Sequence, residues 1–159
     1  YMPLSLTVCN DEIYSAFYDD SKLKAFFHGH SYTGNPIACA TANASYDLYV
    51  NEKRLDDVKF INTKMRQALK VEEVQMHPLV RNLRFMGGIA AIEFETAKES
   101  SYFDGLGAHL HQKFLEKGIL LRPLGNTLYF LPPYTITVHS LEHCLRSIKE
   151  VINELDYDI

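Results

Sequence analysis

The segment from residue 80 to residue 94 limits the fold of this chain more than any other. Two stretches rich in β-forming residues, 80–85 and 89–94, are joined through Met86-Gly87-Gly88. A glycine pair between two such stretches permits the positive φ that a tight hairpin turn requires. The segment therefore predicts two antiparallel strands, and with them a sheet that must bury one of its faces.

The residues after this hairpin supply the elements that would cover the buried face. A helix, two strands and a final helix are expected at 107–117, 119–122, 127–131 and after Ser140. Gly118 provides the stop signal of the first helix, and Ser140 is expected to cap the last one, which is strongly amphipathic. The order ββαββα predicts a small α+β domain with helices on one face of its sheet.

The first half of the chain predicts one strand and three helices. Residues 2–9 alternate like a strand, and Asn10 is expected to cap a short helix after it. Asn35-Pro36 is expected to begin a second helix that ends near Asn51, and apolar spacing predicts a third at 55–74. Because the first strand is already under way at the start and no initiator methionine precedes it, we also expect a truncated chain.

Composition excludes several classes of partner. The chain has 159 residues, 47% of them hydrophobic, which is enough for one core or for one small domain plus part of another. A net charge of -4 without clustered Lys or Arg argues against nucleic acid, and no apolar run approaches the roughly 20 residues of a membrane helix. Three cysteines without a CxxC spacing are expected to be buried thiols of a cytoplasmic protein.

The loop at residues 28–35 is the strongest candidate for a binding site. It places two imidazoles, the hydroxyls of Ser31 and Thr33 and several backbone NH groups directly before a helix N-terminus. The helix dipole and unpaired NH groups at such a position favour an anion such as a phosphate. The alternative is a purely structural turn, because a capped helix after a glycine-containing loop is common.

Arg122 is the second candidate. It follows the apolar run 118–121 and precedes the turn Pro123-Leu-Gly125. At the end of a strand, its guanidinium would be placed to bind a carboxylate or phosphate through two hydrogen bonds. The alternative is a surface arginine paired with a nearby acid.

The other polar clusters do not indicate a metal site or a hydrolase. His109 and His111 would diverge on a helix, and no CxxC or HExxH motif supplies further metal ligands. No GxSxG motif is present. Glu93 and Glu95 share one face of a predicted strand and are interpreted as ordinary sheet surface. We therefore predict no bound metal.

Two separated motifs resemble the class III pyridoxal-phosphate-dependent aminotransferases. The first is HGHSYTGNP at residues 28–36, followed by an alanine-rich helix. The second combines LRPLG at 121–125 with LYFLPPY at 128–134. The resemblance extends over essentially the whole chain. It implies the C-terminal portion of an α/β fold-type I transferase, with residues 1–52 ending the large cofactor-binding domain and residues 53–159 forming the small domain.

The resemblance also implies a chemistry and a set of partners. The cofactor would be pyridoxal 5'-phosphate, and the likeness is strongest to the branch that makes 7,8-diaminononanoate for biotin. That reaction moves an amino group from S-adenosylmethionine to 8-amino-7-oxononanoate. The implied assembly is a homodimer with shared active sites.

Individual roles follow from the same resemblance. Ser31 matches the hydroxyl residue that binds the cofactor phosphate, with His30 beside it, in a loop that reaches into the neighbouring subunit's site. Gly29 matches a backbone contact to substrate, and Arg122 matches the arginine that holds the substrate carboxylate. These assignments make residues 28–35 and Arg122 the site residues expected of this chain.

The resemblance leaves this chain without a catalytic residue. In the family, the Schiff-base lysine, the acidic partner of the pyridine nitrogen and the glycine-rich part of the phosphate cup all precede the position of Tyr1. The ten lysines of the chain lie in polar turns and amphipathic helices. We therefore expect no turnover by this chain alone. A non-catalytic assembly or anion-binding module, or an ω-aminotransferase of another substrate, are the alternatives.

Overall fold

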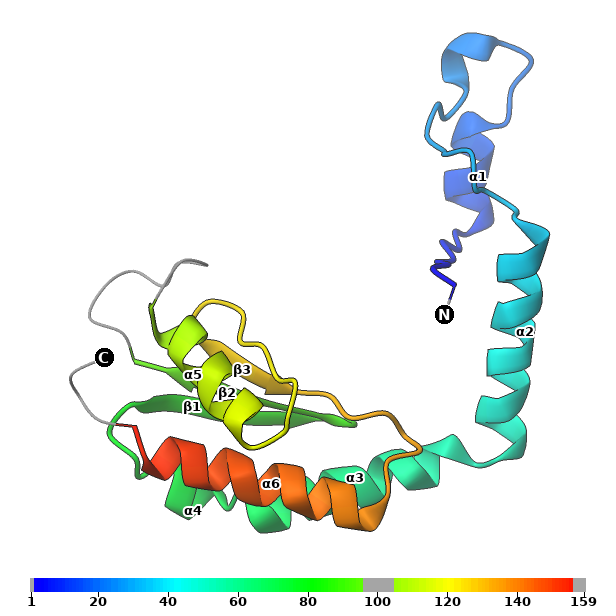
Figure 1. Ribbon diagram of the computed structural model, residues 1–159. Helices are drawn as coiled ribbons and strands as arrows, with labels where there is room; N and C mark the ends of the chain where they lie inside the picture. Colours follow the sequence, from blue (N-terminus) through cyan, green and yellow to red (C-terminus); the bar gives the residue numbers. More distant parts are fainter. Residues whose placement is uncertain (1, 96–104, 156–159) are drawn as a thin grey trace. The chain divides into compact units, whose positions relative to one another are not determined.

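The computed structural model describes residues 2–95 and 105–155, and the chain separates into two compact units, Tyr1–Lys53 and Arg54–Ile159 (Figure 1). We call them unit 1 and unit 2. None of the helices in the described ranges is long and apolar enough to cross a membrane.

Unit 2 combines a three-stranded antiparallel sheet with four helices in its described residues (Figure 1). Its elements are α3 (Arg54–Ala68), α4 (Val71–Val74), β1 (Val80–Met86), β2 (Ile89–Phe94), α5 (Gly105–Glu116), β3 (Thr127–Phe130) and α6 (Val138–Asn153). The strands lie in the order β1-β2-β3. The predicted third helix is thus two helices, α3 and the short α4.

The predicted hairpin is confirmed. Met86 pairs with Ile89, so only Gly87 and Gly88 form the turn between β1 and β2. Gly87 has a φ of +52°, which L side chains rarely adopt. Gly88 is restricted by space instead, because a Cβ there would lie 3.3 Å from the ring of Tyr134. A side chain is therefore disfavoured at Gly87 by the backbone conformation, and at Gly88 it would require the Tyr134 ring to move.

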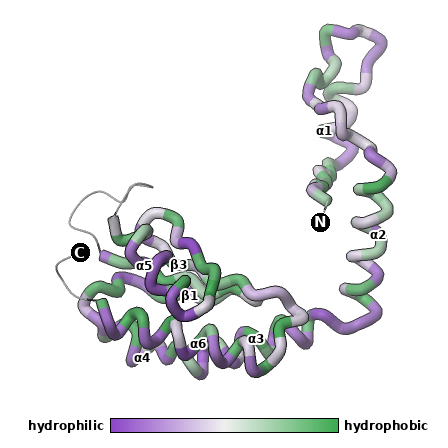
Figure 2. Tube along the Cα trace, viewed as in Figure 1, coloured by the Kyte–Doolittle hydropathy of each residue, from purple (hydrophilic) through white to green (hydrophobic). Residues whose placement is uncertain are grey.

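One face of the sheet and the helices share a single hydrophobic core. Leu83, Ile92 and Leu128 form a cross-strand row on the buried face. Phe114 from α5 and Ile148 from α6 join the same cluster and are almost completely removed from solvent. Along α6, hydrophobic and hydrophilic positions alternate as an amphipathic helix requires (Figure 2). Unit 2 thus has a core of its own.

The predicted strand at 119–122 is wrong, so the observed order is ββαβα. Ile119 and Leu121 are buried and Leu120 is 83% exposed, so burial alternates along this segment as it would in a strand. No residue of 119–122 pairs with the sheet, whose described strands end at β3. The segment thus has the burial pattern of a strand, but strand formation also requires a neighbouring strand with free backbone groups.

The predicted cap of the last helix is displaced by three residues. Thr137, and not Ser140, is the N-cap of α6, and its Oγ1 accepts a hydrogen bond from the Ser140 amide at 3.1 Å. Both residues are good capping residues, and the observed choice places one more turn of helix before Leu141. Gly118, by contrast, ends α5 with a φ of +74°, as expected.

Unit 1 contains α1 (Asp11–Phe17), a short 3-10 helix at Lys22–Lys24 and α2 (Pro36–Asn51). The predicted caps of α1 and α2 are confirmed: the Asn10 side chain accepts from Ile13, and Asn35 precedes a proline at the first helical position. The predicted strand at 2–9 is not formed, and no described residue of unit 1 belongs to a strand with which it would pair.

Unit 1 has almost no buried side chains. Ala38 is the one described residue of this unit that is buried, while Leu6, Val8 and Phe27 are each more than 80% exposed. The expectation of buried thiols is accordingly wrong for Cys9 and Cys39, which are exposed. Cys144 in unit 2 is partly buried, and this burial raises the pKa of its thiol. All three cysteines are free thiols. The elements of unit 1 therefore depend on local hydrogen bonds.

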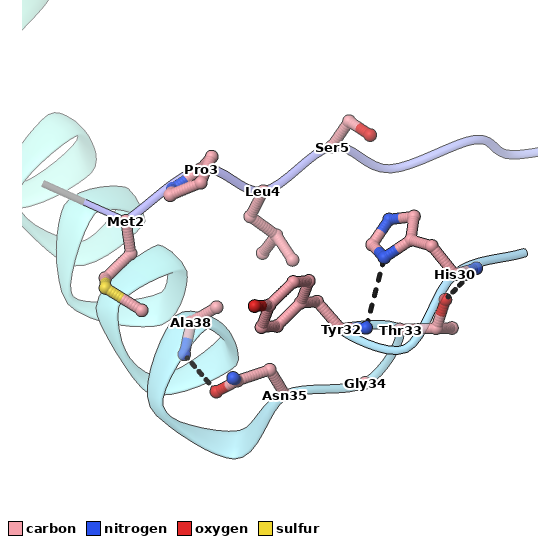
Figure 3. A pocket seen from close by; sticks show the side chains of 10 residues that line it. All are labelled: Met2, Pro3, Leu4, Ser5, His30, Tyr32, Thr33, Gly34, Asn35 and Ala38. Carbon is pink, nitrogen blue, oxygen red and sulfur yellow. Dashed lines mark hydrogen bonds between the residues drawn. The ribbon is translucent and has the colours of Figure 1, made fainter.

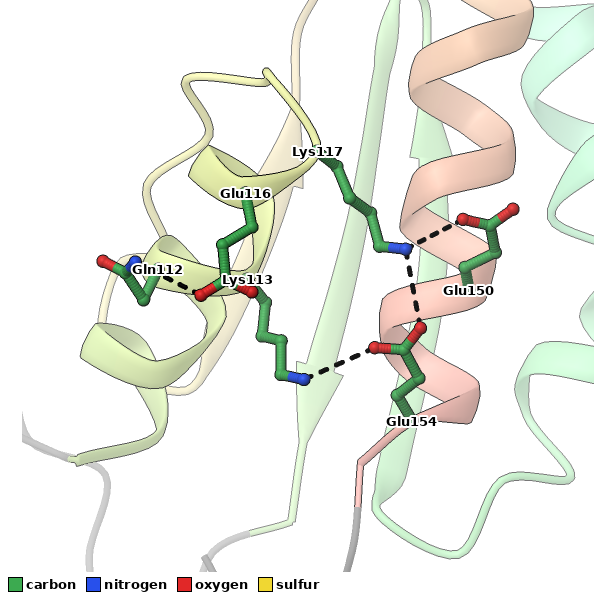
Figure 4. A network of polar contacts seen from close by, with 6 residues as sticks. All are labelled: Gln112, Lys113, Glu116, Lys117, Glu150 and Glu154. Atoms are coloured by element: carbon green, nitrogen blue, oxygen red, sulfur yellow. Dashed lines mark hydrogen bonds and ion pairs between the residues drawn. The ribbon is translucent and has the colours of Figure 1, made fainter.

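A network of ion pairs joins the end of α5 to α6 (Figure 4). The Lys117 ammonium lies 2.9 Å from a carboxylate oxygen of Glu150 and 3.5 Å from one of Glu154, which also pairs with Lys113. The hydrogen bond between Lys117 and Glu150 raises the pKa of the lysine above its usual 10.5 and lowers the pKa of the carboxyl below its usual 4.5.

Replacing Glu150 with Gln is expected to destabilise unit 2 at neutral pH and to have less effect in acid. A carboxyl whose pKa is lowered by folding stabilises the native state above its unfolded pKa, and this contribution is lost as the pH falls through the folded value. The difference in urea midpoint between wild type and E150Q should therefore shrink as the pH falls below 4.5. E116Q, which alters a carboxylate bonded to Gln112, is the control. A pH-independent difference would contradict the prediction.

Candidate functional site

The loop at residues 28–35 is a compact turn held by its own hydrogen bonds. The Thr33 amide donates to the His30 carbonyl at 3.0 Å, and the Asn35 amide donates to the Tyr32 carbonyl at 3.1 Å. Gly34 has a φ of +69°, which explains a glycine at this position. The sequence thus specifies one backbone path into α2.

Both the side chain and the amide of His30 form hydrogen bonds within this turn. Its Nδ1 accepts a hydrogen bond from the Tyr32 amide at 3.1 Å, and its own amide donates to Thr33 Oγ1 at 3.3 Å (Figure 3). An imidazole nitrogen that accepts from an amide carries no proton, so the proton of the neutral ring lies on Nε2. His30 therefore retains one ring donor, Nε2–H, for a ligand beside the loop.

The N-terminus of α2 does not provide the unpaired NH groups that the sequence led us to expect. Asn35 Oδ1 accepts from the amides of Ile37 and Ala38 at 3.0 and 3.2 Å, and the Asn35 carbonyl accepts from the Cys39 amide. Pro36 has no NH group. The capping residue itself thus uses the donors of the first turn, and an anion at this loop must be bound by other groups.

Ser31 has hydrogen-bond donors that the turn does not use. It is exposed, and within the described residues neither its amide nor its hydroxyl has a hydrogen-bond partner. At Gly29 the backbone is similarly open, since the nearest atom to a Cβ placed there would be Thr33 Oγ1 at 3.9 Å. A phosphate needs donors that are not already used, and two are available at Ser31. The loop therefore leaves two donors at Ser31 open to an anion.

A cavity of about 740 Å³ lies next to this loop within unit 1 (Figure 3). His30, Tyr32 and Thr33 form one wall, and the opposite wall is the segment from Met2 to Ser5. Ser31 and Gly29 do not line it. Sequence reasoning missed the segment 2–5 as part of a site, because it was interpreted only as a strand, and no local signal connects it with a loop 25 residues later.

Arg122 lies in unit 2, in the irregular segment between α5 and β3. Its neighbours Leu121 and Pro123 are buried, whereas Arg122 itself is exposed. The turn that follows is closed by reciprocal backbone hydrogen bonds between Leu124 and Thr127. The arginine is thus carried by a backbone anchored on both sides, although not at the end of a strand as predicted.

Three polar side chains outside the two candidate sites, those of Glu93, His111 and His143, make contacts within the fold. Glu93 lies 3.8 Å from Arg81 and 3.5 Å from Arg84, so its interpretation as sheet surface is confirmed. His111 and His143 each contact a backbone carbonyl. In the described ranges, no group of three or more His, Cys, Asp or Glu residues is placed to hold a metal ion.

Seven lysines of the described residues form ion pairs, which is the wrong environment for a covalent bond with a cofactor. A lysine that forms such a bond needs a lowered pKa so that its amine is neutral. Lys117 has a raised pKa instead, because of Glu150. Ion pairs with carboxylates also engage Lys24, Lys59, Lys64, Lys70, Lys113 and Lys149.

Comparison with known proteins assigns the chain to a family. Residues 2–152 match the family described as Aminotransferase class-III. The chain belongs to the class III aminotransferases. An adenosylmethionine-8-amino-7-oxononanoate aminotransferase of Helicobacter pylori is 39% identical over 161 residues, and one of Synechococcus elongatus is 36% identical over 155. Each alignment covers 98% of this chain and 35% of the relative, so the chain spans about a third of the length of these curated relatives.

Solved structures of aminotransferases have the same fold. The crystal structure of adenosylmethionine-8-amino-7-oxononanoate aminotransferase from Methanocaldococcus jannaschii superimposes with a TM-score of 0.76 and 30% identity, covering 92% of this chain and 34% of that one. The expected fold class, part of a fold-type I aminotransferase, is confirmed.

Replacing Asn35 with Ala is expected to expose the first turn of α2. Loss of a side-chain cap costs about 1 kcal/mol, which corresponds to roughly fivefold faster local opening. Hydrogen exchange of the Ile37 and Ala38 amides, measured by NMR, should accelerate by about this factor. Asn35→Ser retains an acceptor and is the control. Unchanged exchange in N35A would show that Asn35 does not protect these amides.

Proposed function

We propose that this chain is the C-terminal third of a pyridoxal-phosphate-dependent aminotransferase that transfers an amino group from S-adenosylmethionine to 8-amino-7-oxononanoate. The observation that carries the proposal is the class III match over residues 2–152. Relatives named adenosylmethionine-8-amino-7-oxononanoate aminotransferase are up to 39% identical to the chain. In this assignment residues 1–52 complete the large domain and residues 53–159 form the small domain. The protein acts in the cytoplasm.

The two units contribute different binding functions. The Ser31 amide and hydroxyl hold the cofactor phosphate, His30 Nε2–H lies beside it, and the open backbone at Gly29 contacts substrate. Arg122 binds the carboxylate of the acceptor, because a guanidinium matches a carboxylate with two parallel hydrogen bonds. Pyridoxal phosphate, when bound, supplies the reactive aldehyde and electron sink for moving the amino group. The lysine that carries the cofactor belongs to the preceding part of the enzyme.

The exposed apolar surface of unit 1 supports this assignment. An isolated unit that buries only Ala38 among its described residues does not meet the ordinary requirement of a domain for a hydrophobic core. The rest of a large domain and a second subunit would cover such a surface. We infer a homodimer in which the loop at 28–35 serves the cofactor of the neighbouring subunit.

Replacing Ser31 with Ala in the complete enzyme is expected to weaken cofactor binding. A hydrogen bond to a charged group contributes about 1.5–3 kcal/mol, so the dissociation constant of pyridoxal phosphate should rise roughly tenfold or more. The measurement is cofactor titration followed by absorbance. Ser45→Ala, on α2 beyond the loop, is the control and should bind normally.

A mixed dimer tests whether the loop acts across the interface. One subunit carries S31A, and the other lacks the cofactor lysine. If Ser31 serves the neighbour, the one site that retains its lysine also retains Ser31 and should bind pyridoxal phosphate as tightly as the wild type does. If Ser31 serves its own subunit, that site carries the substitution and should bind the cofactor as weakly as S31A does. Weak binding of the S31A kind would contradict the shared site.

Replacing Arg122 with Ala is expected to abolish selection for the acceptor carboxylate. The measurement is the ratio of kcat/KM for 8-amino-7-oxononanoate to that for its methyl ester, which should fall about tenfold or more when the charged hydrogen bonds are removed. Arg146→Ala, at an exposed position of α6, is the control. An unchanged ratio in R122A would reject this role, and faster turnover of ornithine or 4-aminobutyrate by the wild type would reject the substrate.

A further inference from the structure

The segment between Lys117 and Pro123 crosses from α5 towards β3 without pairing with the described sheet. Backbone carbonyls in such a segment still require hydrogen-bond partners where they are shielded from water. Two histidine side chains meet this requirement. His111 Nδ1, from α5, lies 3.0 Å from the Leu121 carbonyl oxygen, and His143 Nε2, from α6, lies 3.1 Å from that of Lys117.

The direction of the His111 hydrogen bond follows from its chemistry. A carbonyl oxygen only accepts, so Nδ1 of His111 must carry a proton to make this contact. The neutral ring in this position is therefore the Nδ1–H tautomer. His111 is partly buried on α5, whose neighbouring residues Leu110 and Phe114 are completely buried in the core of unit 2. The Nδ1–H donor of His111 is thus carried by a helix that is packed into the core of unit 2.

The carbonyl oxygen that accepts this hydrogen bond belongs to the peptide group between Leu121 and Arg122. The Leu121 carbonyl and the Arg122 amide share one planar unit, so a hydrogen bond to that oxygen orients the backbone from which the arginine side chain projects. Burial of Leu121 and Pro123 holds the same backbone by packing. The backbone of Arg122 is also restricted because it precedes Pro123, and the hydrogen bond from His111 adds a direct constraint on the Leu121 carbonyl.

We propose that His111 is a positioning residue for Arg122, fixing the Leu121–Arg122 peptide so that the guanidinium is aimed at the substrate carboxylate. The inference rests on the proposed function of Arg122. It assigns His111 an effect on selectivity for the carboxylate, beyond any effect on folding. Binding groups displaced by about an ångström lose much of their contribution, which is why the backbone behind Arg122 matters.

The first experiment examines the hydrogen bond in the chain itself. Histidine labelled with ¹⁵N in the 159-residue chain reports which ring nitrogen carries the proton. The expected result at a pH where the ring is neutral is an Nδ1–H tautomer for His111, assigned by its loss in H111A. An Nε2–H tautomer would overturn the proposal, because Nδ1 would then have no proton to donate.

The second experiment measures selectivity in the complete enzyme. H111A is expected to lower the acid-to-ester ratio of kcat/KM by up to about tenfold, the equivalent of one lost hydrogen bond, with a smaller change for the ester itself. His111→Asn places an amide NH₂ near the position of Nδ1 and should restore most of the ratio. His109→Ala, two residues earlier on α5, is the matched control. Because a general loss of stability would lower both activities equally, an unchanged ratio in H111A would overturn the proposal.

The two proposals fail in different ways. If R122A leaves the ratio unchanged, the proposed function of Arg122 is wrong, and with it the inference about His111. If R122A removes the selectivity but H111A behaves like H109A, only the positioning role of His111 is wrong. Thermal unfolding of each variant confirms that the comparison is made between folded proteins.

Discussion

The hydrophobic core of unit 2 is the interaction on which the rest of that unit depends. Phe94, Phe114 and Ile148 come from the sheet, α5 and α6, and all three are nearly or completely removed from solvent. Truncating any of them would cost a few kcal/mol, a large part of the stability of a domain of this size. Because this core holds α5 and α6 against the sheet, it also places His111 and His143 where they meet the segment before Arg122.

Unit 1 is organised in a different way. Its described residues contribute one buried side chain, Ala38, so packing does not define its conformation. The hydrogen bonds of Asn10, His30 and Asn35 define the local conformation instead. Such bonds depend only on residues two or three positions apart, and they form without a surrounding domain. The loop can therefore have a defined shape in a unit whose apolar side chains remain exposed.

The same distinction explains what the sequence could predict. The caps at Asn10 and Asn35, the hairpin at Gly87 and the helix end at Gly118 are local, and all were predicted correctly. The strands expected at 2–9 and 119–122 are not formed, because a strand also requires a neighbouring strand, which the local sequence does not specify. At Thr137 and Ser140 two good caps compete within three residues, and sequence alone does not rank them. Of the proposed site, the family motif predicted Ser31 and Arg122, and their roles stay predictions. The walls of the cavity at Met2 and the contact of His111 arise from the tertiary fold, which local sequence does not specify.

The contrast between the units has a consequence for specificity. A group that binds a constant part of every ligand, such as a cofactor phosphate, tolerates some adjustment, because a hydroxyl and an amide on an open turn can follow an oxygen atom. An arginine that selects one carboxylate by two parallel hydrogen bonds tolerates little, since both bonds depend on one orientation of the guanidinium plane. The proposed phosphate ligand, Ser31, lies in a loop held by local hydrogen bonds. The backbone of the proposed carboxylate ligand, Arg122, is held by the buried neighbours Leu121 and Pro123 and by the hydrogen bond from His111.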